Sequence, residues 1–220
     1  MTAEESQDRR ERRSGEEEID HPSGARITTL ADGVFAIVMT LLVLGIEMPQ
    51  VSHEYLDEKL VNEILTVWPK VGAFVVSFLV LGIYWMGHHT QFHFMRGVNR
   101  SVLWINIAFL MVVSLVPFTT RVVGHYGTQG IALWLYAGNL ILISLVLLAH
   151  WRYVVGADLL TEAADEEIVQ GATRQILVGP LIYVVAIAVS FFDARWALMV
   201  ILVAPVLHIL PGPIHLHWTR

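Results

Sequence analysis

Long apolar stretches, separated by short polar segments, fill the chain after residue 22. Each stretch has about the length of a helix that crosses the hydrocarbon core of a bilayer, which is about 30 Å thick. This pattern predicts an all-α, polytopic membrane protein with six transmembrane helices. The six stretches are residues 27–48, 69–94, 102–123, 130–150, 174–192 and 194–212.

The polar ends of the chain predict tails rather than domains. Residues 1–22 mix Glu, Asp and Arg with almost no apolar residue, which is typical of a disordered, solvated segment. The sequence thus divides into a charged tail at 1–22, a six-helix transmembrane domain at 23–213 and a short C-terminal tail at 214–220. No signal peptide is visible, so the first apolar helix is expected to act as the signal anchor.

Two connecting segments are long enough to carry structure of their own. Residues 50–67 have apolar side chains at near-helical spacing among Glu and Asp, which predicts an amphipathic helix at the membrane surface, ended by Trp68 and Pro69. Residues 151–173 carry several acidic side chains and predict a solvated link, which is either helical or, as the notable charge favours, a plain charged linker. The last two apolar stretches are so close together that a tight hairpin is expected around residues 193–195.

Composition supports this class of protein and excludes several kinds of chemistry. The 220 residues are 55% hydrophobic and only 15% charged, with a mean hydropathy of +0.58, which is typical of an integral membrane protein. The absence of cysteine excludes disulfides, thiolate metal sites and cysteine nucleophiles. The net charge of -6 argues against a nucleic-acid partner, and no GxSxG motif, catalytic carboxylate pair or metal motif indicates an enzyme.

Lysine and arginine are distributed unevenly between the two sides that six membrane crossings create. Ten lie on the side of the termini and four on the other, so the positive-inside rule predicts a multi-pass protein with both termini in the cytoplasm. The ten are Arg9, Arg10, Arg12, Arg13, Arg26, Arg96, Arg100, Arg152, Arg174 and Arg220; the four are Lys59, Lys70, Arg121 and Arg195.

The first apolar stretch opens with two charged side chains, Arg26 and Asp32. A charge at membrane depth costs several kcal/mol, roughly 2.5 to 3.5 by insertion scales, so it persists only when it is paired, hydrated or lining a cavity. A separation of six residues puts the two charges about 120° apart around a helix, outside the relations that let side chains meet. Their partners should therefore lie on other helices, in a polar network inside a bundle.

The end of the second apolar stretch offers partners at the same level. Trp85, His88 and His89 lie three and four residues apart, so they share much of one helix face. Asn106 on the third stretch is a further candidate, since buried amides in a bilayer form hydrogen bonds between helices. The predicted structural polar network consists of Arg26, Asp32, Trp85, His88, His89 and Asn106.

A metal site is an alternative interpretation of the histidines. His89 and His93 have the i, i+4 spacing of a ligand pair on one helix. The HExxH form with its glutamate base is absent, and the sequence marks no third ligand. The sequence therefore favours a hydrogen-bond network, with no metal, no cofactor and no catalytic residue.

Together these motifs resemble those of a known family. The motif RxxxLAD, from Arg26 to Asp32, is similar to the RxxxFSD signature helix of the unconventional potassium channels called transmembrane protein 175, in their single-repeat prokaryotic form. The YWxxHH and WxN motifs of the next two stretches match that family as well, so the resemblance covers about residues 26–120. Leu30 and Ala31 replace the Phe and Ser of the signature, which removes a hydroxyl that could join the network.

The resemblance implies a homotetrameric channel in the cell membrane, with a central pore lined by the first helix and permeable to potassium and related monovalent cations. Counted from Asp32, the family pattern puts the narrowest ring at Ile37, Thr40 one turn deeper and Leu44 after it. The helical period alone gives an overlapping stripe, otherwise typical of ordinary helix packing, through Gly33, Ile37, Leu41 or Thr40, Leu44 and Met48.

Potassium preference in such a channel needs a source other than the usual filter. No Thr-Val-Gly-Tyr-Gly loop occurs in the chain, so dehydration by backbone carbonyls is excluded. A hydrophobic constriction of first-helix side chains disfavours the more strongly hydrated sodium ion, and threonine hydroxyls replace part of the hydration shell. Two alternatives stay open. One is a proton- or cation-coupled secondary transporter using Asp32 and the histidines, although the internal repeats typical of carriers are not evident; the other is a non-conducting membrane scaffold or an intramembrane enzyme.

Overall fold

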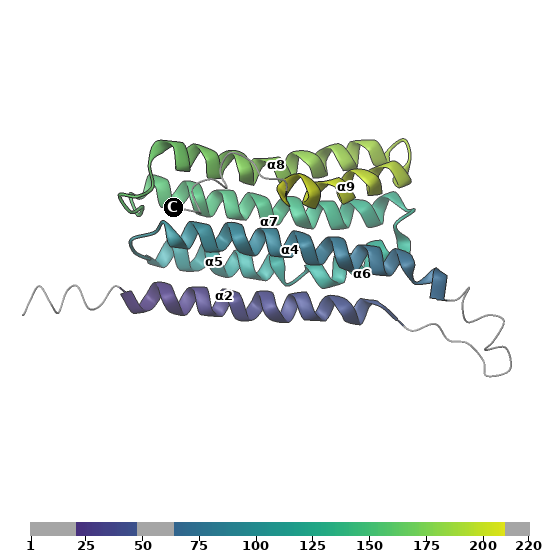
Figure 1. The fold of residues 1–220 in the computed structure, drawn as a ribbon, viewed down its shortest axis with the longest axis horizontal. Coiled ribbons are helices and arrows are strands. Elements are labelled where there is room, and N and C mark those ends of the chain that lie inside the picture. Colours follow the sequence, from purple (N-terminus) through teal and green to yellow (C-terminus); the bar gives the residue numbers. More distant parts are fainter. Residues whose placement is uncertain (1–20, 48–63, 210–220) are drawn as a thin grey trace, which may run out of the picture.

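The computed structural model describes residues 21–47 and 64–209, so the predicted tails lie almost entirely outside the described residues. The described residues form a bundle of helices that run side by side (Figure 1). Apart from an isolated bridge between Met95 and Leu160, these residues contain no β-structure. In chain order the elements are α2 (His21–Leu41), the 3-10 helix η1 (Leu42–Gly45), α4 (Trp68–His93), α5 (Arg100–Val113), α6 (Val116–Tyr126), α7 (Gly130–Gly156), α8 (Glu166–Ser190) and α9 (Ala194–Ile209).

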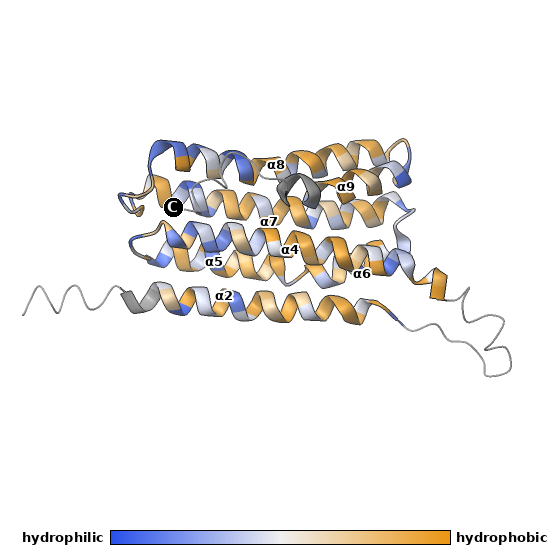
Figure 2. Cartoon of the chain, in the orientation of Figure 1, coloured by the Kyte–Doolittle hydropathy of each residue, from blue (hydrophilic) through white to orange (hydrophobic). Residues whose placement is uncertain are grey.

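Six helical segments account for the membrane-spanning part of the chain. Five are long and apolar enough to cross a bilayer, and α9 adds a shorter apolar helix at Ala194–Pro205. The prediction of an all-α polytopic membrane protein with six helices is confirmed, and hydrophobic residues cover much of every helix in Figure 2. The five long spans are Gly24–Gly45, Ile64–His93, Arg100–Tyr126, Gly130–Gly156 and Glu166–Ser190.

The bundle has α7 in its interior and α2 along one edge. α7 packs against α5, α6, α8 and α9, and its Tyr136, Ile143 and Trp151 side chains are at most 2% exposed. α2 packs against α4, α5 and α6. In Figure 1, α2 lies along the lower edge of the bundle and α8 along the upper edge. One side of α2 is therefore left without a neighbour from the described residues of its own subunit.

The third span is interrupted, whereas the sequence predicts one continuous helix. α5 ends at Val113 and α6 begins at Val116, so Ser114 and Leu115 separate them. The break occurs because Pro117 has no N–H to donate to the Val113 carbonyl. Ser114 instead donates its hydroxyl to the Leu110 carbonyl at 2.8 Å. The first span also changes form, from α2 into the 3-10 helix η1.

The link predicted at residues 151–173 is much shorter in the structure. α7 continues past Trp151 because this side chain is fully buried, and its indole donates to the Val169 carbonyl of α8 at 3.3 Å. α8 starts directly after Asp165, whose carboxylate caps the helix by accepting from a first-turn amide at 2.8 Å. The prediction of a solvated link is therefore wrong at both ends, and only residues 157–165 connect the two helices.

The structure at the starts of α4 and α9 can be compared with two predicted connections, the surface helix before α4 and the hairpin before α9. Of the surface helix predicted at residues 50–67, only residues 64–67 are described, and they continue into α4 as one apolar helix. Pro69 lies in the first turn of α4, where its missing N–H costs no hydrogen bond, and the helical turn at residues 64–66 ends at Val67, just before it. The predicted hairpin between the last two spans is present, with the Asp193 carboxylate accepting from the Arg195 amide at 2.7 Å.

The loops that follow α4 and α7 are joined to each other. The Arg96 amide donates to the Leu159 carbonyl at 2.9 Å, and the Thr161 amide donates to the Phe94 carbonyl at 2.8 Å. The Arg96 guanidinium also pairs with the Asp158 carboxylate at 2.9 Å. These contacts fix the loop between α4 and α5 against the loop between α7 and α8.

Candidate functional site

α2 has two unlike faces. The residues predicted to line a pore lie on one of them, where Ile37 is 60%, Leu41 42% and Leu44 61% exposed. The opposite face packs on the bundle through residues spaced four, four, three and four apart, which keeps them on one side of the helix. These packed residues are at most 7% exposed: Ile27, Ala31, Phe35, Val38 and Leu42. The predicted stripe is therefore the face of α2 that residues 21–47 and 64–209 leave bare.

The bare face of α2 is apolar over the predicted stripe except for one hydroxyl. Thr40 Oγ1 lies 3.0 Å from the Ala36 carbonyl oxygen and 2.8 Å from that of Ile37, so its hydrogen is donated to its own helix. The hydroxyl oxygen keeps lone pairs that can contact a cation. Gly33 leaves open space in the same stripe, and Met48, the last predicted member, lies outside the described residues.

Asp32 is held by the second span. Trp85 Nε1 donates to Asp32 Oδ1 at 2.7 Å, and the His89 ring centroid lies 5.6 Å from that of Trp85. Arg26 is exposed and makes no ion pair within the described part of the chain. The structure thus brings together Asp32, Trp85 and His89, but it does not bring Arg26 to them.

His88 and Asn106 form a separate, buried pair. His88 Nε2 lies 2.8 Å from Asn106 Oδ1, and both residues are at most 3% exposed. The imidazole stacks on Phe109, with ring centroids 5.1 Å apart and planes 5° from parallel, and the Phe35 ring of α2 lies 6.5 Å away. Instead of one network, the structure therefore has two pairs, one exposed and one buried.

Sequence reasoning missed a second buried polar contact beside His88. Gln91 Oε1 lies 2.6 Å from His150 Nδ1, and Gln91 Nε2 donates to the Leu147 carbonyl at 3.1 Å. His150 Nε2 is buried with no hydrogen-bond partner among the described residues, and its ring lies 6.3 Å from that of His88. Gln91 follows His88 by three residues on the same helix face, which is the signal that could have found it.

Buried hydroxyl groups extend this polar interior along α4. Ser77 lies 2.9 Å from the Tyr136 hydroxyl and accepts from Thr120 at 2.8 Å, and Tyr84 lies 2.8 Å from the Ser144 hydroxyl. The polar positions 77, 84 and 91 recur every seven residues, a pattern that the sequence displays by itself. Hydrogen bonds between helices in a bilayer contribute about 0.6 kcal/mol each on average, so these contacts stabilise the bundle.

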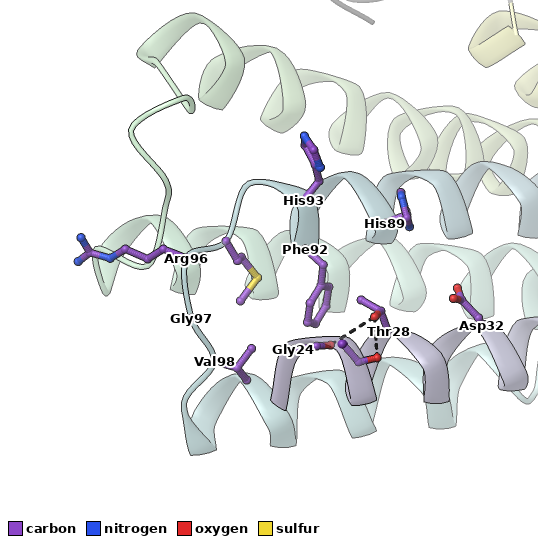
Figure 3. A pocket seen from close by; sticks show the side chains of 11 residues that line it. Gly24, Thr28, Asp32, His89, Phe92, His93, Arg96, Gly97 and Val98 are labelled. Carbon is purple, nitrogen blue, oxygen red and sulfur yellow. Dashed lines mark hydrogen bonds between the residues drawn. The ribbon is translucent and has the colours of Figure 1, made fainter. Parts of the chain in front are cut away.

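A pocket of about 310 Å³ opens between the N-terminal half of α2 and the C-terminal end of α4 (Figure 3). Its polar side chains include Thr28, Asp32, His89 and His93, and Arg96 lines its outer end. Within the described residues there is no group of three His, Cys, Asp or Glu side chains that could hold a metal ion. His89 and His93 therefore find no third ligand there.

The geometry defines a polytopic α-helical membrane protein whose first span presents one packed and one bare face. Comparison with known proteins is more specific. Residues 26–117 match the family model described as "Endosomal/lysosomal potassium channel TMEM175". A potassium channel of Chamaesiphon minutus is 36% identical over 173 residues, which cover 76% of this chain and 84% of that protein. The chain belongs to the TMEM175 family.

Other relatives agree with this assignment. A potassium channel of Streptomyces collinus is 31% identical over 174 residues, covering 77% of this chain and 83% of that protein. The crystal structure of a lysosomal potassium-selective channel TMEM175 homolog from Chamaesiphon minutus is similar, with a TM-score of 0.75, 32% identity, and coverage of 85% of this chain and 96% of that one. The human endosomal/lysosomal proton channel TMEM175 is 30% identical over 112 residues, which is 49% of this chain and 22% of the human protein. The family consists of ion channels, so the resemblance and the prediction that the chain is not an enzyme are confirmed.

Proposed function

We propose that the protein is a potassium-permeable cation channel in which four copies place the bare face of α2 around a central pore. The observation that carries this proposal is the division of α2 into a fully packed face and an uncovered apolar stripe with a single hydroxyl. The relatives matched over more than four-fifths of their length are described as potassium channels. The human proton channel is matched over only 22% of its length, so potassium is the better supported ion.

In this proposal, Ile37 forms the constriction, with Thr40, Leu41 and Leu44 following along the same stripe. Four isoleucines that converge on an axis exclude water from a short segment, and an ion there loses hydration without replacement. Sodium holds its water more strongly than potassium and therefore meets the higher barrier. The Thr40 oxygen offers partial replacement of the lost water, so selectivity among potassium, rubidium and caesium should be weak.

The polar pairs have a structural role in the proposed channel. The contact between Asp32 and Trp85 fixes the rotation of α2 about its own axis, because it ties one side of the helix to α4. The pair of His88 and Asn106 joins α4 to α5 beneath the packed face of α2. We assign Arg26, which has no ion pair among the described residues of its own subunit, to the contact between subunits.

The proposal also places the protein in the cell membrane with both termini on the cytoplasmic side. The start of α2, the end of α4, the start of α5 and the end of α7 lie at one end of the bundle in Figure 1. Arg26, Arg100 and Arg152 belong to these helix ends, which supports a cytoplasmic location. The pocket beside Asp32 then opens on the cytoplasmic side, and the end of η1 faces outward.

Reconstitution of the purified full-length protein in planar bilayers tests the proposed function. We expect unitary potassium currents of fixed amplitude, smaller sodium currents, and a tetramer by native mass measurement in nanodiscs. Saturable flux without unitary steps would instead identify a coupled carrier that uses Asp32 and the histidines. A strictly monomeric protein would contradict the shared pore.

A further inference from the structure

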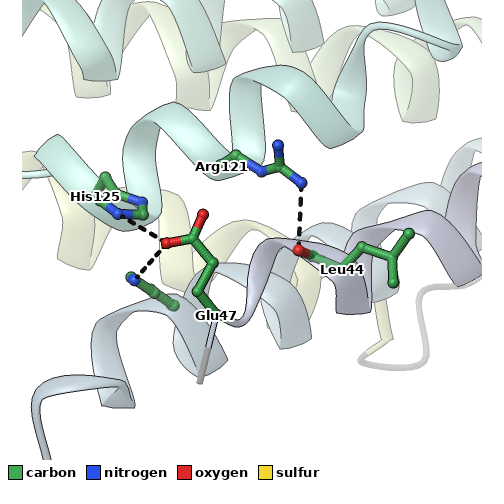
Figure 4. A network of polar contacts seen from close by, with 5 residues as sticks. Leu44, Glu47, Arg121 and His125 are labelled. Carbon is green, nitrogen blue, oxygen red and sulfur yellow. Dashed lines mark hydrogen bonds and ion pairs between the residues drawn. The ribbon is translucent and has the colours of Figure 1, made fainter. Parts of the chain in front are cut away.

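Three charged or titratable side chains meet at the C-terminal end of the first span, and a fourth, Arg121, binds the backbone of that span nearby (Figure 4). Glu47 Oε2 lies 3.5 Å from Lys70 Nζ of α4 and 3.5 Å from His125 Nε2 of α6. Arg121, one turn before His125, donates from Nη2 to the Leu44 carbonyl at 3.2 Å. The end of the first span is therefore fastened to both α4 and α6.

This cluster lies where the bare stripe of α2 ends. Leu44 belongs to the 3-10 helix η1, and Arg121 binds its backbone carbonyl, which leaves the exposed Leu44 side chain free for the pore. The Glu47 side chain is 56% exposed and the His125 side chain 33% exposed, so protons in the surrounding water reach both. None of these side chains has a role in the constriction proposed above.

We propose that His125 and Glu47 form a proton-binding site at this mouth of the pore, and that protonation there reduces the entry of potassium from the same side. The effect on current rests on the proposed function. Proton binding itself rests only on the contact between the two side chains.

Charge counting gives the direction of the effect. With His125 neutral, the cluster holds one negative charge on Glu47 and two positive charges on Lys70 and Arg121, which sum to +1 per subunit. A protonated His125 pairs with the same Glu47 oxygen and raises the sum to +2. The charged groups around His125 are the Glu47 carboxylate and the cations of Lys70 and Arg121, and the uncharged Tyr126 ring lies 5.8 Å away.

The size of the effect follows from four such sites around one opening. Histidine is the side chain whose charge normally changes between about pH 5 and 8. Four added positive charges within about one Debye length, roughly 10 Å, lower the local concentration of a monovalent cation about two- to threefold. Potassium entry from this side should fall by the same factor, because the hydrophobic constriction deeper in the pore is unchanged.

Unitary potassium currents of the full-length protein in planar bilayers test the effect. When the compartment on the Glu47 side is acidified from about pH 8 to about 5.5, we expect a two- to threefold smaller current for potassium entering from that side. His125→Gln should abolish the response, whereas Lys70→Gln, which removes a fixed charge but no titrating imidazole, should keep it. A parent current that is insensitive to pH overturns the inference, as does a response of His125→Gln equal to that of the parent.

Thermal unfolding in nanodiscs tests the proton site without any current. A charged imidazole 3.5 Å from the Glu47 carboxylate would form an ion pair in the folded protein that the unfolded chain lacks. The Tm of the parent relative to His125→Gln should therefore rise as the pH falls from about 8 to about 5.5. A Tm difference equal at both pH values overturns the proton site even in a conducting protein. A pH-dependent Tm difference without unitary current at any pH contradicts the proposed function and the effect on current, but supports proton binding.

Discussion

Replacing Ile37 with asparagine is expected to raise the unitary potassium conductance roughly two- to tenfold and to erode the preference for potassium over sodium. Ile37 is 60% exposed on the bare face of α2, and four copies around an axis would form an apolar ring. Amides in that ring hold water, so an ion crossing it keeps part of its hydration shell and meets a lower barrier. Bilayer recordings with potassium and sodium gradients give both quantities.

Leu181→Asn is the matched control for this substitution. Leu181 is 65% exposed, close to the value for Ile37, but it lies on α8 at the opposite edge of the bundle in Figure 1. We expect its conductance and ion preference to equal those of the parent. Val38 is unsuitable as a control because it is only 4% exposed on the packed face, where an amide would cost stability. Unchanged permeation in Ile37→Asn would reject Ile37 as the constriction.

Replacing Phe35 with alanine should lower the free energy of unfolding by about 3 to 5 kcal/mol, the usual cost of removing a buried phenylalanine. Phe35 is 2% exposed, and its ring centroid lies 6.0 Å from that of Phe109 and 6.5 Å from that of His88. The substitution leaves a cavity between α2, α4 and α5, so α2 loses its main aromatic contact with the bundle. Denaturant titration in detergent measures the loss.

Ile37→Ala provides the comparison on the same helix, two residues away on the bare face. Because Ile37 is 60% exposed, we expect a change of less than about 1 kcal/mol. Equal losses for Phe35→Ala and Ile37→Ala would mean that both faces of α2 are packed, and the bare face could not line a pore.

The sequence predicts helix number well because apolar stretches of bilayer length are a strong signal. It predicts the helix ends less well, since a single side chain moves them. Pro117 interrupts the third span, and the burial of Trp151 carries α7 beyond the predicted end. The break at Pro117 is a local effect that the expectation of one continuous helix missed, whereas the burial of Trp151 depends on what lies across the bundle, which no local pattern contains.

Some contacts of the candidate site could likewise be predicted from the sequence, and others could not. Asp32 and Trp85 lie at one depth on neighbouring spans, so their motifs place them together, and the structure joins them by a hydrogen bond. The contact of Gln91 with His150 and that of Glu47 with His125 join residues far apart in sequence. Neither carries a spacing signal that specifies its partner, so packing of the helices was needed to find them.

Covalent modification of a single introduced cysteine tests most directly whether the bare face of α2 lines the pore. The chain has no cysteine, so Leu44→Cys creates the only thiol in each subunit. Leu44 is 61% exposed on the proposed pore stripe, and Leu181→Cys offers an equally exposed position on α8. A positively charged methanethiosulfonate reagent applied during recording should reduce the unitary potassium current of Leu44→Cys irreversibly and leave that of Leu181→Cys unchanged. An unchanged current in modified Leu44→Cys, or an equal reduction in both variants, would contradict a pore lined by α2.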